Sequence, residues 1–247
     1  RFLTQRTFPR MALIATALDA THLTLSASAA PMLQIARASD PTAPLRNVSV
    51  WKSENLLAED CGGAVAIFLS NFLATPCRLV RIGPAFIRPL PPQKLPPSLG
   101  SHLSAPHSAR IVTFADAYPL LIIGESTLAD LNDRLVTRGS DALPMDRFRP
   151  NLVIAGAPAF AEDTWPRLRI GTATFRAGGP CARCIMTTTD QITGARDGPE
   201  PLRTLATYRR DLTDPTDVNF GQNLLHETKF GSLHVGDPVE LLSSTAP

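Results

Sequence analysis

The chain has few cysteines, no excess of charge of either sign and no long apolar run. Its four cysteines are unevenly spread over 247 residues, which excludes the disulfide framework of small secreted proteins. Lys and Arg number 24 against 22 Asp and Glu, and a net charge of +2 gives no reason to expect a nucleic-acid partner. No apolar stretch approaches the length of a membrane span, so we expect no membrane segment in this chain. These shortages indicate a protein of a reducing compartment.

Several common signatures are missing as well. The sequence has no Gly-rich phosphate loop, no dinucleotide fingerprint and no Ser/His/Asp nucleophile pattern. The chain begins at Arg1, and no basic-then-apolar signal peptide follows. We therefore expect a fragment of a cytoplasmic protein whose own start is missing. A membrane anchor before Arg1 would instead indicate the mitochondrial outer membrane.

Proline, by contrast, is plentiful and clustered. Of 23 prolines, five fall between Pro89 and Pro97. Proline lacks the backbone donor and fixes φ, so this segment is unsuited to a central strand or a helix interior. We predict a linker over residues 84–106, which separates an N-terminal domain (residues 1–83) from a C-terminal domain (residues 107–247).

Short apolar runs separated by turn residues predict a β-rich, α+β fold, closer to a barrel than to a doubly wound sheet. Strands are expected at residues 11–17, 22–26, 47–51, 77–82, 111–114, 120–123 and 152–155, in a hairpin of 168–170 with 173–175, and in two pieces within 232–241. Helices are expected at residues 64–73, 127–136 (with Ser126 as N-cap) and 201–209.

The most informative stretch is Cys181-Ala-Arg-Cys184, which two more residues and three threonines follow. A cationic neighbour such as Arg183 favours the thiolate, the form that binds metal or attacks an electrophile. The hydroxyls of the threonines could donate hydrogen bonds to an anion. A thiolate beside a cation and several donors suits a metal-bearing, anionic cofactor better than a structural bridge.

A Cys-x-x-Cys pair alone is also compatible with a redox dithiol, half of a zinc site or two unrelated thiols. A closed zinc site needs four ligands, yet Cys61 and Cys77 lie far upstream. The histidines show no paired ligand spacing; they are His22, His102, His107, His226 and His234. A thioredoxin-type site would open a helix, whereas the β-branched residues 185–189 predict a strand. Zinc and dithiol readings are therefore disfavoured.

Six motifs in a fixed order carry a family resemblance. They are FRPNLVI (148–154), AEDTW (161–165), CARC with two threonines (181–188), PLRTL (201–205), FGQN (220–223) and GDPV (236–239). This pattern resembles the MOSC domain, the C-terminal domain of molybdenum cofactor sulfurases. It is most similar to the branch with the mitochondrial amidoxime reducing component and its bacterial homologues. The likeness is close over residues 111–242 and weaker at the front. It implies a MOSC β-barrel domain with flanking helices, preceded by part of an N-terminal β-barrel domain.

The resemblance also implies a molybdenum cofactor (Mo-molybdopterin). It makes Cys184 the metal ligand and the catalytic residue, and Cys181 a packed or neighbouring thiol. Matching positions for cofactor binding are Arg149, Asn151, Ala182, Arg183 and Asn223, with Asp116 and Tyr118 on a segment that approaches the cofactor. The plainer alternatives are a surface cation at Arg149 and turn caps at Asn223 and Asp116.

Two departures from the family pattern stand out. Asn223 occupies a position where mitochondrial members have tyrosine. The family's N-terminal lysine-serine segment and the arginine after it have no counterpart, so we expect this chain to bind the cofactor weakly or not at all.

The activity implied is reduction of small N-hydroxylated compounds to the amine plus water. Since the sequence has no second redox centre, we expect an external electron donor, either a cytochrome b5 system or a flavin or ferredoxin reductase. One alternative is a sulfurase-type module that carries sulfur or cofactor beside a pyridoxal-phosphate desulfurase. The other is a β-rich binding module without catalysis.

Overall fold

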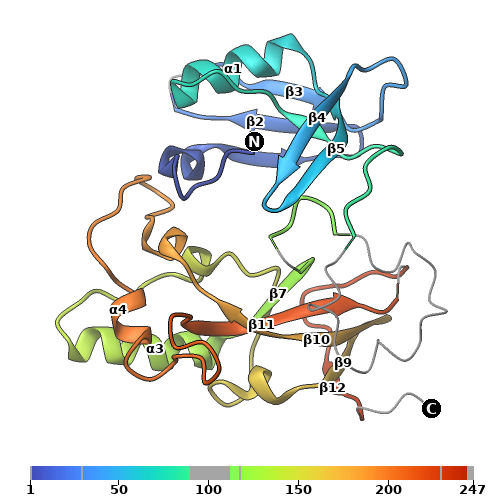
Figure 1. Ribbon diagram of the computed structural model, residues 1–247. Coiled ribbons are helices and arrows are strands. Elements are labelled where there is room, and N and C mark those ends of the chain that lie inside the picture. Colours follow the sequence, from blue (N-terminus) through green and yellow to red (C-terminus); the bar gives the residue numbers. More distant parts are fainter. Residues whose placement is uncertain (1, 29, 90–111, 117, 229, 244–247) are drawn as a thin grey trace. The chain divides into compact units, whose positions relative to one another are not determined.

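The computed structural model describes residues 2–28, 30–89, 112–116, 118–228 and 230–243. They form two compact units, one of residues 1–88 with 189–197 and one of residues 89–188 with 198–247. Both are rich in strands and poor in helices (Figure 1), which confirms the predicted fold class. The predicted linker lies largely outside the described residues, and the predicted domain boundaries stay a prediction.

The N-terminal unit contains two three-stranded antiparallel sheets and one long helix. Their order is β1-β2-β3 and β4-β5-β6. The elements are η1 (Pro9–Leu13), β1 (Ala15–Leu18), β2 (His22–Ser26), β3 (Leu33–Ala36), β4 (Leu45–Val50), β5 (Ser53–Asp60), α1 (Gly63–Leu73) and β6 (Val80–Arg81). Helix α1 follows its prediction, and it buries Val65, Phe68 and Leu69 against Leu25 of β2 and Ile35 of β3.

Two strand predictions in this unit are wrong at their ends. Residues 11–13 belong to η1, because Pro9 at its first position favours a helical start. Only Val80–Arg81 of the predicted strand 77–82 pairs with β5. The reason is that the backbone N–H of Cys77 bonds the Ser70 hydroxyl of α1, at 2.9 Å, in place of a neighbouring strand.

The C-terminal unit is built on a curled six-stranded sheet of order β12-β9-β10-β11-β7-β8 (Figure 1). Its strands are β7 (Leu120–Gly124), β8 (Leu152–Ile154), β9 (Arg167–Ile170), β10 (Ala173–Ala182), β11 (Asn219–His226) and β12 (Val239–Leu241). Neighbours are antiparallel except β7 and β8, which are parallel. The helical elements of this unit are α3 (Glu125–Thr137), η4 (Met145–Phe148), η5 (Ala161–Thr164), η6 (Ile185–Thr188) and α4 (Leu202–Leu205).

Two apolar clusters flank the middle of this sheet. Ile123 of β7 packs with Phe148, Phe220 and the α3 residues Leu131 and Leu135 in one cluster. The neighbouring Ile122 packs in a second cluster, with Leu168, Phe175 and Leu224. Successive strand residues point to opposite faces, so β7 is covered on both sides. This double cover explains the unbroken apolar sequence of β7.

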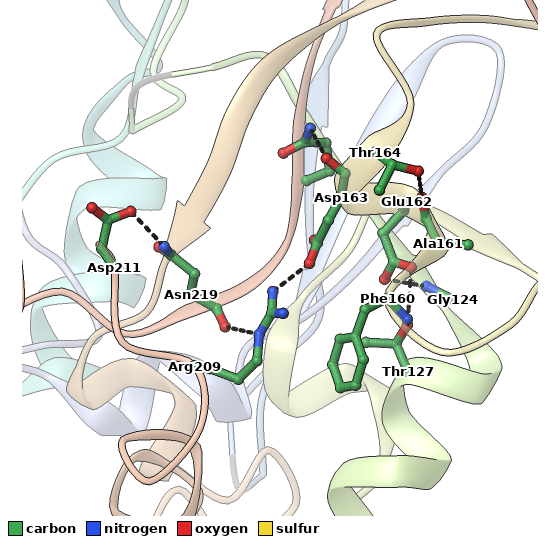
Figure 2. A network of polar contacts seen from close by, with 11 residues as sticks. Gly124, Thr127, Phe160, Ala161, Glu162, Asp163, Thr164, Arg209, Asp211 and Asn219 are labelled. Carbon is green, nitrogen blue, oxygen red and sulfur yellow. Dashed lines mark hydrogen bonds and ion pairs between the residues drawn. The ribbon is translucent and has the colours of Figure 1, made fainter. Parts of the chain in front are cut away.

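Helix α3 begins two residues earlier than predicted, and Ser126 does not cap it. Gly124 occupies the N-cap position, and no side-chain cap of the usual local kind is present. The buried carboxylate of Glu162 accepts hydrogen bonds from the Gly124 N–H (3.0 Å) and the Thr127 hydroxyl (2.9 Å) instead (Figure 2). The Thr127 oxygen in turn accepts the N–H of Phe160 at 2.8 Å. A residue distant in sequence therefore satisfies the helix start.

The strand predicted after Cys184 is wrong, because residues Ile185–Thr188 form the 3₁₀ helix η6. The Thr187 N–H and hydroxyl both donate to the carbonyl of Cys184, each at 3.0 Å. The Thr188 hydroxyl donates to the Ile185 carbonyl at 2.8 Å. Short polar side chains that bond the nearby backbone compete with strand pairing, and here they override β-branched propensity.

The remaining predictions have mixed outcomes. The hairpin is confirmed, with Gly171 at its turn at φ 54°. Of the two strands expected within 232–241, only Val239–Leu241 forms, and α4 is shorter than the helix expected at 201–209. Residue 111 lies outside the described residues, and 112–114 form no strand. Strand β11 was not predicted. Within the described part of the chain, no helix has the length and apolar character needed to span a bilayer.

Candidate functional site

The cysteine motif lies where β10 leaves the sheet of the C-terminal unit. Two register shifts against β11 interrupt β10, one after Ala177 and one after Pro180. Gly179 between them has φ 108°, a conformation that favours glycine. Ala182, exposed, pairs with Asn219 at the end of the ladder. The irregular strand therefore delivers residues 181–184 to the rim of the sheet.

The two thiols of the motif have different surroundings. Cys181 packs against the apolar cluster that contains Phe148 and Leu205, and its sulfur accepts a hydrogen bond from Arg183 Nη1 at 3.0 Å. Cys184 immediately precedes η6 and lies close enough to Arg149 to influence its charge. Neither thiol is in a disulfide. The two thiols therefore have different neighbours, and the assignment of Cys184 as the metal ligand stays a prediction.

Arg183 is held by two of its three kinds of N–H group. Besides the contact with Cys181, its Nη2 donates to the carbonyl of Phe148 at 2.7 Å. Its Cζ lies 5.8 Å from the centroid of the Phe148 ring. The remaining donor, Nε, is buried and has no hydrogen-bond partner among the described residues. A buried donor without a partner is unfavourable unless a ligand or water satisfies it.

Arg149 brings a second positive charge to the same place. It follows η4 in the left-handed conformation, with φ 54° and ψ 47°, which turns the chain toward β8. Part of the residue is exposed, yet burial of its guanidinium lowers the pKa of Arg149, and the charge of Arg183 lowers it further. The thiol of Cys184 acts in the opposite direction. Within the described residues, no carboxylate forms a salt bridge with either arginine.

The two asparagines lie on either side of Leu121 in β7. The Asn151 side-chain oxygen accepts the N–H of Leu121 at 2.9 Å, and the Asn151 N–H donates to the Leu121 carbonyl at 2.9 Å. Asn223 is the β11 residue opposite Leu121, and its Nδ2 donates to the carbonyl of Pro180 at 3.0 Å. The alternative of Asn223 as a turn cap is wrong, because it lies inside a strand. Its amide instead bonds a carbonyl at the β10 irregularity.

Tyr118 lies against the same irregularity. A Cβ added at Gly178 would come within 2.5 Å of the Tyr118 ring, so the ring fills the space that any larger residue would need. Burial raises the pKa of Tyr118. Asp116 is exposed on the segment that leads to it. Of the predicted residues, Arg183 and Cys184 are neighbours in the chain, and Arg149 lies near enough to both to feel their charges.

Sequence reasoning missed what the threonines do. Their hydroxyls were expected to face an anion, but those of Thr187 and Thr188 donate to backbone carbonyls of the same turn. Thr187 is buried and holds the Cys184 carbonyl through two donors, so it fixes the backbone that carries the thiol. The run of threonines was the available signal, and only its interpretation failed.

The donor set fits a metal that brings its own organic ligand. Among the described residues, no group of three or more His, Cys, Asp or Glu side chains could hold a bare ion. One thiol beside two arginines, with a buried N–H group that lacks a partner, suits an anionic group whose metal takes a single protein sulfur.

Comparison with known proteins supports the family resemblance that the ordered motifs carry. The model of the MOSC domain matches residues 109–240, and that of the MOSC N-terminal beta barrel domain matches residues 1–76. Mitochondrial amidoxime-reducing component 1 of Homo sapiens is 36% identical over 247 residues, which cover 97% of this chain and 68% of that protein. Mitochondrial amidoxime reducing component 2 of Homo sapiens is 34% identical over 244 residues, which cover 96% of this chain and 68% of that protein.

A third relative is the molybdenum cofactor sulfurase of Danio rerio. It is 35% identical over 184 residues, which cover 71% of this chain but only 20% of that protein. The resemblance drawn from the ordered motifs is therefore confirmed, and the chain belongs to the MOSC domain family.

Proposed function

We propose that this protein is a molybdenum-cofactor-dependent reductase of N-hydroxylated compounds. The observation that carries the proposal is Arg183, fixed by Cys181 and the Phe148 carbonyl with a buried Nε that lacks a described partner, while Arg149 lies near enough to feel its charge and neither arginine pairs with a described carboxylate. Two like charges in one partly buried place favour a bound anion. The relatives named amidoxime-reducing components supply the class of reaction.

In this proposal each residue has a defined task. The Cys184 thiolate would hold the metal, and Thr187 keeps the backbone of Cys184 in place. Arg149 and Arg183 would bind the anionic end of the cofactor, since a guanidinium offers paired donors to phosphate oxygens. The bound cofactor would supply the two-electron reduction of the N–O bond. Asn151 and Asn223 would offer their side-chain amides to the cofactor. Ala182 would let the cofactor approach the backbone. Asp116 and Tyr118 would border the site.

Reduction of an N-hydroxyl group consumes two electrons and two protons and gives the amine, amidine or base plus water. We propose a separate protein as electron source, either a cytochrome b5 system or a flavin or ferredoxin reductase. Two of the relatives are named as mitochondrial proteins, whereas the sequence favoured the cytoplasm, so the location stays a prediction.

A sulfurase-type role is the second candidate, and the Danio rerio relative favours it. In that role Cys184 would carry sulfur or hold cofactor for delivery, next to a pyridoxal-phosphate desulfurase. A protein of this kind would bind molybdenum cofactor without reducing any N–O substrate.

The test uses the full-length protein purified from a cofactor-sufficient host. Metal analysis and pterin fluorescence should show molybdenum cofactor, and reduced viologen should support reduction of benzamidoxime. NADH alone should give no reaction, and protein from tungstate-grown cells should be inactive. Cofactor-loaded protein that reduces no N-hydroxylated compound would overturn the reductase and leave the sulfur carrier; protein without molybdenum would overturn both.

A further inference from the structure

We propose that Cys181 is a positioning residue that acts through Arg183. Its sulfur is the acceptor for Arg183 Nη1 at 3.0 Å, while the Phe148 carbonyl takes Nη2 at 2.7 Å. These two contacts fix the guanidinium from one side. Nε is left as the buried donor without a described partner. The inference rests on the proposed function for what Nε would bind, but the contact itself does not.

Electrostatics explains why such an anchor is needed. Burial is the largest cause of the lowered pKa of Arg149. The charge of Arg183 is the second cause, so the two arginines repel each other. Without a fixed acceptor, repulsion would favour conformations in which Arg183 turns away from Arg149. The sulfur of Cys181 prevents this without adding a carboxylate, which would neutralise the pair and compete with an anionic ligand. A thiol at this place therefore preserves the positive charge.

The plainer role for Cys181 is packing, since it contacts the Phe148 and Leu205 cluster. Two substitutions separate the roles. Cys181→Val keeps an apolar side chain of similar size and removes the acceptor. Cys181→Ser keeps an acceptor for Arg183 and removes apolar contact. If Cys181 positions Arg183, Cys181→Ser should retain more cofactor than Cys181→Val. If Cys181 only packs, Cys181→Val should retain more.

The first measurement is molybdenum and pterin content per chain of the full-length protein. We expect Cys181→Val to lose about tenfold in cofactor retention, the size of a lost hydrogen bond to a charged group, and Cys181→Ser to stay near wild type. Cys77→Val is the matched control, because the Cys77 sulfur accepts a hydrogen bond from the Ser70 hydroxyl, at 3.8 Å, where Cys181 has an arginine. Retention by Cys181→Val with loss in Cys181→Ser would overturn the proposal.

The second measurement needs no cofactor. Unfolding by urea of the cofactor-free protein is compared for Cys181→Val, Arg183→Met and the double variant. If Cys181 acts through Arg183, the two changes are non-additive, and Cys181→Val has little further effect once Arg183 is gone. Additive changes would overturn the proposal. If even wild-type protein lacks molybdenum, the proposed function fails, and this coupling still decides the role of Cys181.

Discussion

The C-terminal unit holds arginines in two different ways. Arg209 meets a carboxylate, since its Nη2 lies 2.5 Å from Asp163 Oδ2, and its Nε donates to the Asn219 carbonyl at 3.1 Å (Figure 2). Its Cζ also lies 4.5 Å from the centroid of the Phe160 ring. Arg149 and Arg183, by contrast, share a place without a described carboxylate. The chain itself supplies a carboxylate to Arg209, although Asp163 Oδ1 is buried without a hydrogen-bond partner among the described residues, whereas no described carboxylate pairs with Arg149 or Arg183.

On the proposed function, Arg209 is a structural charge, and Arg149 and Arg183 are binding charges. Arg209 joins the segment before β11 to η5, so its partners are fixed parts of the fold. Mutual repulsion between Arg149 and Arg183 destabilises the ligand-free state. A bound anion would offset this repulsion by attracting both guanidinium groups. Mutations should therefore act on stability at the first group and on cofactor at the second.

The largest effect is expected at Cys184, the proposed metal ligand, whose thiol influences the charge of Arg149. Cys184→Ser should abolish benzamidoxime reduction and lower molybdenum content, because it removes the proposed protein bond to the metal. Both are measured on full-length protein by viologen-coupled assay and metal analysis. Cys77→Ser serves as the control and should keep full activity. An active Cys184→Ser protein would show that this thiol does not hold the metal.

The next effect tests the pair directly. Arg149→Ala should lower cofactor content by about tenfold, since a charge-assisted bond to phosphate is lost. The free energy of unfolding of the cofactor-free protein should stay equal or rise, because a repelling charge disappears and no core cavity forms. Metal analysis and urea denaturation check the two halves. The exposed Arg169, paired with Glu240, gives the control Arg169→Ala, which should change neither. Normal molybdenum content in Arg149→Ala would remove Arg149 from the site.

The contrast between the two groups was only partly readable in the sequence. The ordered motifs located Arg149, Arg183 and Cys184, and apolar periodicity located α1, α3 and the hairpin. Both signals are local, or follow a fixed order along the chain. Asp163 stood in the AEDTW motif without any sign that its partner would be Arg209, 46 residues away.

The failures share a physical cause, namely hydrogen bonds that no local pattern encodes. Ser126 satisfied the rules for an N-cap, but the carboxylate of Glu162 reached the helix start from 38 residues away. Residues 185–188 had strand propensity, but Thr187 bonds the Cys184 carbonyl. Gly221 interrupts the strand pattern in the sequence of β11. It has φ 81°, and Ile123 would lie within 2.7 Å of an added Cβ. The strand forms nonetheless, because it pairs with its neighbours in the sheet.

At the structural charge the expected loss is in stability. Asp163→Ala leaves Arg209 without its carboxylate in a largely buried place, and should lower the free energy of unfolding by about 1–3 kcal/mol. Molybdenum per folded chain should be unchanged. Asp130→Ala breaks the more exposed i,i+4 pair with Arg134 and should change stability by at most about 0.5 kcal/mol. Urea denaturation measures both. An Asp163→Ala protein that is stable but lacks cofactor would contradict the proposed difference between Arg209 and the pair Arg149 and Arg183.

The smallest effect is a loss of stability at alkaline pH, and it is expected from Tyr208. Burial, and after it the charge of Asp130, raises the pKa of Tyr208 from 10 to about 12, although Arg134 and Arg209 act against this. Below about pH 10 both folded and unfolded chains keep the phenol proton, and the contribution to stability is fully present. As the pH rises toward 12, the unfolded chain releases the proton first and is favoured by up to about 2 kcal/mol, a figure reduced for partial solvent exposure.

Urea denaturation of the cofactor-free protein near pH 9 and near pH 11 measures this loss, with Tyr208→Phe as reference, because phenylalanine has no proton to release. Wild type should lose about 1 kcal/mol more than Tyr208→Phe over that interval, since the other titrating groups are common to both. The Tyr118→Phe variant separates the contribution of the other tyrosine with a raised pKa. Parallel losses in wild type and Tyr208→Phe would mean that Tyr208 titrates alike in both states. Since this titration lies far above neutrality, any pH dependence of the reductase near pH 7 would have to come from other groups.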